Sequence, residues 1–182
     1  NPNKTGGFNG WTAADIATSA DGARSVYVGD IDSDGDLDVL VANGRHWGGP
    51  NRAYYNNGKG AFTRVATIGT GKDRSYAARA LDYNGDGLMD VAIANDRQQS
   101  RIYLEQKNRK FTLGPAIGPA TQNTRNLTIT DLDGDKRPDI LIANRRAANF
   151  IYDHTPRGDL LKGRILGSGA DSTIDIAIGD LN

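Results

Sequence analysis

The nonapeptide Asp30-Ile-Asp-Ser-Asp-Gly-Asp-Leu-Asp38 carries carboxylates at its positions 1, 3, 5, 7 and 9, and a glycine at position 6. Five negative charges in so short a stretch repel one another unless a cation lies between them. Ca²⁺ is a hard cation that takes about six to eight oxygen ligands from carboxylates, carbonyls and water. The pattern therefore predicts a calcium loop.

The spacing also assigns a role to each position of the loop. At position 7 the backbone carbonyl of Asp36 is expected to face the ion, and Gly35 allows the sharp turn between ligands. The side chains expected to point inward are those of Asp30, Asp32, Asp34 and Asp38.

The same pattern recurs along the chain. Second and third copies begin at Asp82 and Asp131, and the start of a fourth lies at Asp180, at separations of 52, 49 and 49 positions. Acidic turns without a metal are the alternative, but the matching spacing and flanks favour about three Ca²⁺ sites. The expected ligands are Asp82, Asn84, Asp86, the Leu88 carbonyl and Asp90 in the second loop, and Asp131, Asp133, Asp135, the Arg137 carbonyl and Asp139 in the third.

The flanks of these loops exclude an EF-hand. That motif needs a glutamate at position 12 between two helices, whereas position 12 is Val41, Ile93 or Ile142 in this chain. Each loop is instead followed by a short apolar run rich in β-branched residues, such as Asp38-Val-Leu-Val-Ala-Asn43, which is typical of a buried strand.

Composition narrows the class of protein. The 182 residues include 23 glycines, a single glutamate and no cysteine, which suits many tight turns, little helix and no disulfide framework. No apolar run approaches the roughly 20 residues of a membrane span, so we expect no membrane insertion. Because the first residue is Asn and no signal peptide is visible, we expect a mature or excised piece of a longer protein. Secretion is expected on other grounds, because extracellular calcium modules often bind at roughly 10⁻⁴ to 10⁻³ M, which cytosolic calcium does not reach.

The net charge of zero conceals an asymmetry. Thirteen of the 22 acidic residues lie in the predicted metal loops, which leaves nine against 22 lysines and arginines. Three bound Ca²⁺ ions would make the formal charge +6, which favours an anionic partner such as an acidic polysaccharide. A scattered surface of solvated basic side chains is the alternative. No motif for nucleic-acid binding is present.

Strand and turn signals repeat in the same order around each loop. Four short strands per unit, at a period near 50 residues, are typical of an all-β fold made of β-propeller blades, each with four antiparallel strands. We predict three complete blades over 23–68, 75–117 and 125–166, with partial blades at 8–18 and 173–182. In this arrangement each metal loop joins the first strand of a blade to the second. Strands are expected near 75–82, 90–95, 101–105 and 110–117 in the second blade, and near 125–131, 139–144, 149–153 and 160–166 in the third. A last strand is expected at 173–178, and Asn57-Gly58-Lys59-Gly60 is expected to form a hairpin turn in the first blade.

The pattern Gly29-Asp-Ile-Asp-Ser-Asp-Gly-Asp-Leu-Asp-Val-Leu-Val-Ala-Asn43, followed by Asn51-Arg-Ala-Tyr-Tyr-Asn-Asn-Gly-Lys-Gly-Ala-Phe62, resembles the FG-GAP/VCBS repeat family. These calcium-bearing blades are found in integrin α-subunit heads and in many secreted bacterial proteins. The resemblance covers nearly the whole of 1–182 and implies part of a seven- or eight-bladed propeller with Ca²⁺ in the loops. The remaining blades are expected from the same parent chain or from association.

The third loop departs from the pattern at position 6, where Lys136 replaces glycine. A left-handed backbone conformation there costs a non-glycine residue roughly 1 kcal/mol, and the lysine brings a positive charge near the metal. We therefore expect the third site to bind calcium most weakly.

Candidates for ligand contact are few. Arg45, His46 and Trp47 lie in a loop that is three residues longer than its counterparts, and a guanidinium beside an aromatic ring suits a sugar or an acidic sugar. The other histidine, His154, ends a predicted strand and is expected to be incidental. Arg157-Gly158-Asp159 spells the tripeptide that integrins read, but it occupies a predicted hairpin turn in which these residues are common.

Three functional hypotheses follow. The first is a calcium-stabilised extracellular propeller that acts as a binding or adhesion module for carbohydrate or protein ligands, without catalysis. The second is a propeller-fold carbohydrate-active enzyme, such as a polysaccharide lyase that uses Arg45, His46 and tyrosines. The third is a structural scaffold. The sequence offers no cysteine nucleophile and no Gly-x-Ser-x-Gly elbow, so the enzyme is not the favoured reading.

Overall fold

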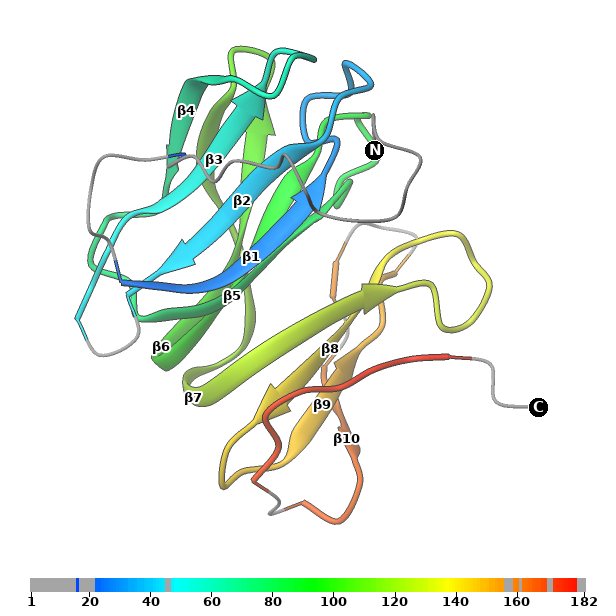
Figure 1. Cartoon of the computed structure of the whole chain (residues 1–182). Coiled ribbons are helices and arrows are strands. Elements are labelled where there is room, and N and C mark those ends of the chain that lie inside the picture. The colour runs from blue at the N-terminus through cyan, green and yellow to red at the C-terminus, as the bar shows by residue number, and fades with distance from the viewer. Residues whose placement is uncertain are drawn as a thin grey trace, which may run out of the picture.

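The computed structural model describes residues 16, 22–44, 47–155, 159–160, 162–169 and 172–179 (Figure 1). These residues form no helix, and their ten strands make two antiparallel sheets, which confirms the all-β prediction. The strands are β1 (Ala23–Gly29), β2 (Asp38–Asn43), β3 (Asn51–Asn56), β4 (Phe62–Ile68), β5 (Ser75–Leu81), β6 (Asp90–Gln106), β7 (Lys110–Thr130), β8 (Asp139–Asn144), β9 (Asn149–Tyr152) and β10 (Arg164–Leu166).

The first sheet is a simple meander in the order β1-β2-β3-β4. Its central strands are the apolar runs that the sequence marks as buried, and Leu40, Ala42 and Ala53 are fully buried. The Asn57-Gly58-Lys59-Gly60 stretch between β3 and β4 is the predicted hairpin turn, with Gly58 at φ 73° and Gly60 at φ 78°. This sheet is called unit 1 below.

The second sheet has six strands because two of its strands are long. β6 has 17 residues and would span about 55 Å if fully extended. However, the Glu105 backbone N–H donates a 2.8 Å hydrogen bond to the Asp90 carboxylate, so the two ends of β6 lie side by side. The chain reverses near Arg97, which has a φ of 56°. β6 is therefore the predicted pair 90–95 and 101–105, joined by a tight turn.

β7 passes from one repeat to the next. Its first half pairs with β6 from Ile117 to Lys110, and its second half pairs with β8 from Thr124 to Thr130. The prediction of two separate strands at 110–117 and 125–131 is corrected here. The connection stays extended because Gln122 and Asn123 pair with the turn of β6. Unit 2 is thus β5, β6 and the first half of β7, and unit 3 is the second half of β7 with β8, β9 and β10.

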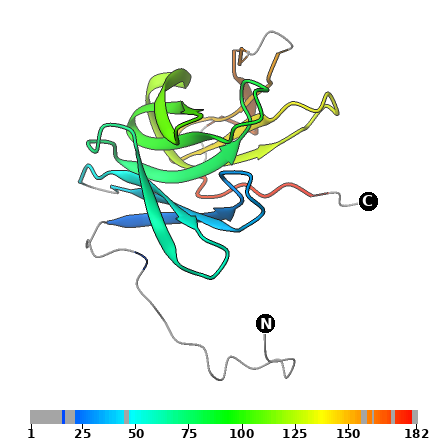
Figure 2. The same cartoon turned by 90° about the horizontal axis from the view of Figure 1, so that it is seen from above.

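Successive units pack through their first strands. β5 contacts β1 on one side and β7 on the other, and the three strands lie in a row in Figures 1 and 2. One apolar core lies between units 1 and 2, where Leu40 and Ala42 join Ala78 and Ala80. A second core lies between units 2 and 3, and there Leu127 packs with residues of β5 and β6.

The repeat shows which apolar face lacks a neighbour among the described residues. Val26 of β1, Ala78 of β5 and Leu127 of β7 precede their loops by four positions. Ala78 and Leu127 are each 1% exposed, because the preceding unit covers them, whereas Val26 is 58% exposed. The described residues do not close into a ring, and β1 presents an apolar face of the kind that another unit covers elsewhere in the chain.

The ends of the chain differ from the prediction. The partial blade at 8–18 lies outside the described residues, except for Ile16, and so does the fourth loop from Asp180. The strand predicted at 173–178 is not a regular strand, although the Thr128 hydroxyl donates a 2.8 Å hydrogen bond to the Ile176 carbonyl. In the described part of the chain, no strand follows this segment to pair with it as the second strand of a fourth blade. The strand predicted at 160–166 is shorter, covering only Arg164–Leu166.

A buried asparagine closes the second strand of each unit. The side-chain amide of Asn43, Asn95 or Asn144 donates to a backbone carbonyl just before the third strand, at 2.7, 2.9 and 2.6 Å. The side-chain oxygens of Asn95 and Asn144 accept hydrogen bonds from Ser75 and Thr124 at 2.9 and 3.0 Å. The Asn43 oxygen is buried without a partner, because the residue equivalent to Ser75 and Thr124 in unit 1 is Ala23, which has no hydroxyl.

We predict that Ala23→Ser stabilises the protein by up to about 1 kcal/mol, because it supplies the hydroxyl that the Asn43 oxygen lacks. The reverse change, Ser75→Ala, is expected to lower the free energy of unfolding by about 1–2 kcal/mol by leaving the Asn95 oxygen unpaired. Urea unfolding of both variants tests this pair. Stabilisation by Ser75→Ala, or a loss with Ala23→Ser, would contradict it.

Candidate metal centre

The three acidic loops occupy equivalent places in the fold. They join β1 to β2, β5 to β6, and β7 to β8, so each one connects the first strand of a unit to the second. All three contain the same run of bends over their first residues. The predicted ligands are therefore presented three times on the same framework.

The aspartate at position 1 folds each loop around its own carboxylate. In the second loop Asp82 accepts hydrogen bonds from the backbone N–H groups of Gly85 and Gly87, at 2.8 and 3.0 Å. Asp131 accepts the equivalent pair in the third loop at 2.7 and 2.9 Å, and Asp30 accepts a similar pair at 3.1 and 3.0 Å. The backbone thus wraps around a carboxylate even before a metal is considered.

The aspartate at position 9 ties the loop to the sheet. Asp38, Asp90 and Asp139 are at most 1% exposed. In each, one oxygen accepts a hydrogen bond from the backbone N–H at loop position 2, at 2.9, 3.1 and 2.9 Å. The other oxygen accepts one from the end of the third strand, at 2.8, 2.8 and 2.9 Å. This residue therefore joins three segments of its unit.

The carboxylates at positions 1, 3 and 9 converge. Asp30, Asp32 and Asp38 each offer an oxygen within 4.8 Å of the others, and so do Asp131, Asp133 and Asp139. Asp34 and Asp135, at position 5, lie outside these two groups among the described residues. In the second loop Asn84 stands at position 3, so that loop offers an amide oxygen there. The donors are all oxygens, as calcium prefers.

One atom in the first loop lacks a partner. The Asp32 side chain is 4% exposed, and its Oδ1 is buried without a hydrogen bond. A buried carboxylate oxygen is costly to leave unpaired, so this orphaned atom fits a bound cation. The other oxygen of Asp32 forms an ion pair with Arg109, which reaches across from unit 2. One of the predicted ligands of the first loop is therefore also paired with a protein cation.

Position 7 adds a backbone feature to each loop. The N–H groups of Asp36, Leu88 and Arg137 donate to the carboxylate at position 5, at 3.0, 2.9 and 2.8 Å. In the third loop the Arg137 side chain also pairs with Asp135 at 3.0 Å. Lys136 has a φ of 68°, so the expected strain at position 6 is present. That the third loop binds calcium most weakly stays a prediction.

A buried glutamate lies beside the second loop. Glu105 is 4% exposed, and burial with the nearby Asp90 raises its pKa to about 7. Burial raises the pKa of Asp90 to about 6. No pattern in the sequence points to a role for Glu105. Its place at the end of the third strand is equivalent to Asn56 and His154, whose N–H groups bind the other two position-9 aspartates.

The candidate ligand-contact residues fare differently. Arg45 and His46 lie outside the described residues, while Trp47 is 86% exposed on its loop. Arg157 and Gly158 also lie outside the described part of the chain. The expectation that His154 is incidental stays a prediction; its ring is buried and stacks on Tyr83. Only the three-dimensional pairing of units 2 and 3 brings these two rings together.

Strand–loop–strand units with an acidic loop after each first strand define an all-β repeat protein. A family model described as an FG-GAP-like repeat matches residues 34–93 and 82–142, which together span more than half of the chain. The chain belongs to this family. A search of curated proteins found no match. The described residues contain no helix that is long and apolar enough to cross a membrane.

The position-9 aspartates are expected to stabilise the protein without calcium. Asp38→Asn replaces an acceptor oxygen with an N–H₂ group that faces a backbone N–H, so we expect the free energy of unfolding in EDTA to fall by about 1–3 kcal/mol. Asp34→Asn, on the exposed part of the same loop, is the matched control and is expected to change it by less than about 0.5 kcal/mol. Equal losses from the two variants would refute the bridging role of Asp38.

The raised pKa values predict a pH dependence in the calcium-free protein. The pKa of Glu105 rises from 4.5 to about 7 on folding, so the folded state holds more protons than the unfolded state between these values. The contribution of Glu105 to the free energy of unfolding is therefore fully present below about pH 4 and is lost as the pH rises through 7. Glu105→Gln is expected to flatten this decline and to exceed the wild type in stability at pH 8. Parallel stability–pH curves in EDTA would show that Glu105 does not titrate in this way.

Proposed function

We propose that this chain is the calcium-binding part of an extracellular β-propeller that acts as a binding or adhesion module for carbohydrate or protein ligands. One observation carries the proposal: oxygen ligands recur in three loops on one framework, and in two of these loops three carboxylates approach within 4.8 Å. The ions would neutralise the carboxylates and hold the first two strands of each unit together.

The propeller part of the proposal rests on how the units meet. Three units of the same strand order stack through their first strands, and the exposed Val26 on β1 is equivalent to Ala78 and Leu127, which are buried. Further blades, from the same parent chain or from association, would cover that face. The two short matches to the family agree with a longer repeat array.

The extracellular part of the proposal rests on the FG-GAP family and on the calcium affinity of extracellular modules. FG-GAP repeats are typical of extracellular proteins. Calcium modules of extracellular proteins often bind at roughly 10⁻⁴ to 10⁻³ M, a range that cytosolic calcium does not reach. The polysaccharide-lyase alternative depends on Arg45 and His46, which lie outside the described residues. A purely structural scaffold remains the outcome if no ligand binds.

Thermal unfolding in millimolar Ca²⁺ and in EDTA tests the calcium proposal. Each filled site adds RT ln(1 + [L]/Kd), or about 1.4 kcal/mol at ten times the Kd, so the midpoint is expected to rise with calcium. Asp32→Asn and Asp133→Asn should each lose only part of this rise, with the smaller loss in the third loop. Mg²⁺ is the control and is expected to act weakly, since it demands near-octahedral geometry. A midpoint that is the same in calcium and EDTA would refute the proposal.

A further inference from the structure

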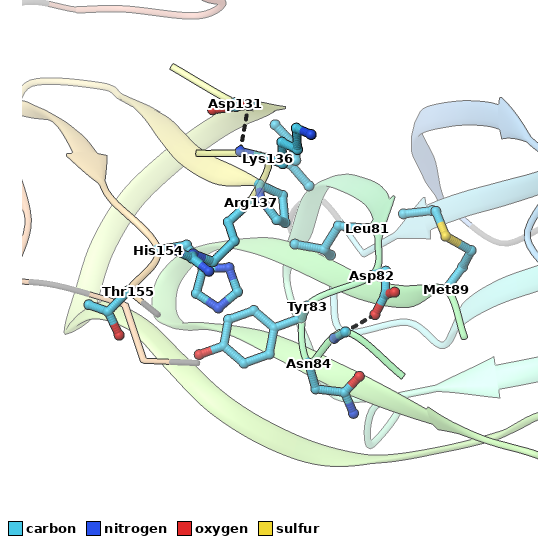
Figure 3. A pocket seen from close by; sticks show the side chains of 14 residues that line it. Leu81, Asp82, Tyr83, Asn84, Met89, Asp131, Lys136, Arg137, His154 and Thr155 are labelled. Atoms are coloured by element: carbon cyan, nitrogen blue, oxygen red, sulfur yellow. Dashed lines mark hydrogen bonds between the residues drawn. The ribbon is translucent and has the colours of Figure 1, made fainter. Parts of the chain in front are cut away.

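A cavity of about 680 Å³ lies between the metal loops of units 2 and 3 (Figure 3). Tyr83 and Asn84 of the second loop form one wall, and Lys136 and Arg137 of the third loop form another. His154, from the end of β9, also lines the cavity. The floor is apolar and includes Ala80, Leu81, Met89, Ile129 and Pro138. The cavity has the size and the mixed lining of a small-molecule site.

His154 contributes a buried imidazole to the cavity lining. His154 is 6% exposed, and both of its ring nitrogens are buried without a hydrogen-bond partner. The ring stacks on Tyr83 with a centroid distance of 4.7 Å and an interplanar angle of 12°. Tyr83 is itself held in place by a hydrogen bond with the Leu160 backbone. A buried imidazole with two unmet nitrogens is costly, so a polar group is expected opposite it.

Lys136, an exposed residue, supplies a cation to the cavity wall. At this loop position Gly35 and Gly87 adopt φ values of 93° and 81°, and Lys136 adopts 68° in their place. A lysine in this conformation is strained relative to glycine by roughly 1 kcal/mol. No described residue accepts a hydrogen bond or forms an ion pair with its ammonium group. Strain that persists in a cavity wall is typical of a functional position.

The equivalent place between units 1 and 2 is an internal comparison. A cavity of only about 80 Å³ remains there, lined by Ile31, Gly87, Leu88 and Glu105 among others. In the repeat, Ile31 is equivalent to Tyr83, and Gly87 is equivalent to Lys136. In the same way, Leu88 is equivalent to Arg137, and Glu105 is equivalent to His154. Arg109 extends into this space and pairs with Asp32. The same site in the repeat is therefore acidic and filled between units 1 and 2, but basic, aromatic and open between units 2 and 3.

The charges around the open cavity are mixed, and Asp159 also acts on Tyr83, but the groups without a protein partner suit an anion. Asp82 and Asp131 lie at its edge, but both carboxylates already accept backbone hydrogen bonds from their own loops, and calcium would neutralise them further. Arg137 is paired with Asp135, which leaves Lys136 and the His154 nitrogens to meet a ligand. A carboxylate suits these donors. An apolar floor beside a tyrosine ring suits the C–H faces of a sugar.

We propose that this cavity binds an acidic sugar through its carboxylate, such as one uronic acid unit of a polysaccharide. Lys136 and His154 bind the carboxylate, and the apolar floor with Tyr83 holds the ring. This inference rests on the proposed function, because calcium in the second and third loops sets the charge of the cavity. It names the ligand class of that binding module and places the site away from Arg45, His46 and Trp47.

Calorimetric titration of the full chain in saturating Ca²⁺ with α-1,4-digalacturonate tests the proposal. We expect saturable binding at one site, and no binding of the neutral digalactose. Lys136→Gly and His154→Asn should each weaken binding about tenfold, since each removes one contact to the carboxylate. Both changes introduce the residue that another unit carries at that place, Gly87 and Asn56, so the fold is expected to tolerate them. Lys59→Ala, on the β3–β4 turn, is the charge control and should bind as the wild type does.

Several outcomes would overturn the assignment. Equal losses from Lys136→Gly and Lys59→Ala would mean that only general electrostatics attracts the sugar. Binding of triglutamate as tight as that of digalacturonate would assign the cavity to an acidic peptide. Absence of binding, with a normal calcium-induced rise in the unfolding midpoint of the same sample, would reject the sugar site and leave the calcium proposal intact. Absence of that rise would be a failure of the calcium proposal itself.

Discussion

The structure depends on a buried aspartate at the end of each acidic loop. Asp38, Asp90 and Asp139 each accept one hydrogen bond from the start of their loop and one from the end of the third strand. A buried carboxylate without such donors would be very costly, so the loop and the strand must meet at this point. This bridge fixes the loop, and the fixed loop presents the other carboxylates to a common centre.

Around these constant bridges the units vary where they face one another. The third-strand residue that donates to the position-9 aspartate is Asn56, Glu105 or His154. Its backbone performs the structural task, so its side chain is free to change. In unit 2 the result is a buried acid with a raised pKa, and in unit 3 it is an imidazole in an open cavity. A repeat of this kind combines a fixed framework of acidic loops with contact surfaces that differ from unit to unit.

The repeat order, the strands and the convergent loops could be predicted because they arise from local patterns. An apolar run after an acidic loop forms a strand in any unit, and the spacing of Asp30, Asp32 and Asp38 places their oxygens together. The joining of strands within β7 could not be predicted, since it depends on pairing between Gln122 and the turn of β6. The stacking of His154 on Tyr83 could not be predicted for the same reason, because Tyr83 lies in another unit.

Counting the calcium ions bound by the intact chain is the most direct measurement, because the account assigns one ion to each complete loop. Native mass spectrometry of protein dialysed against millimolar Ca²⁺ would resolve the number of ions retained. Three ions per chain are expected, and the third loop is expected to be the first to lose its ion as calcium is lowered. A chain that retains no calcium would contradict it, and the three loops would then be acidic turns held only by their own backbone.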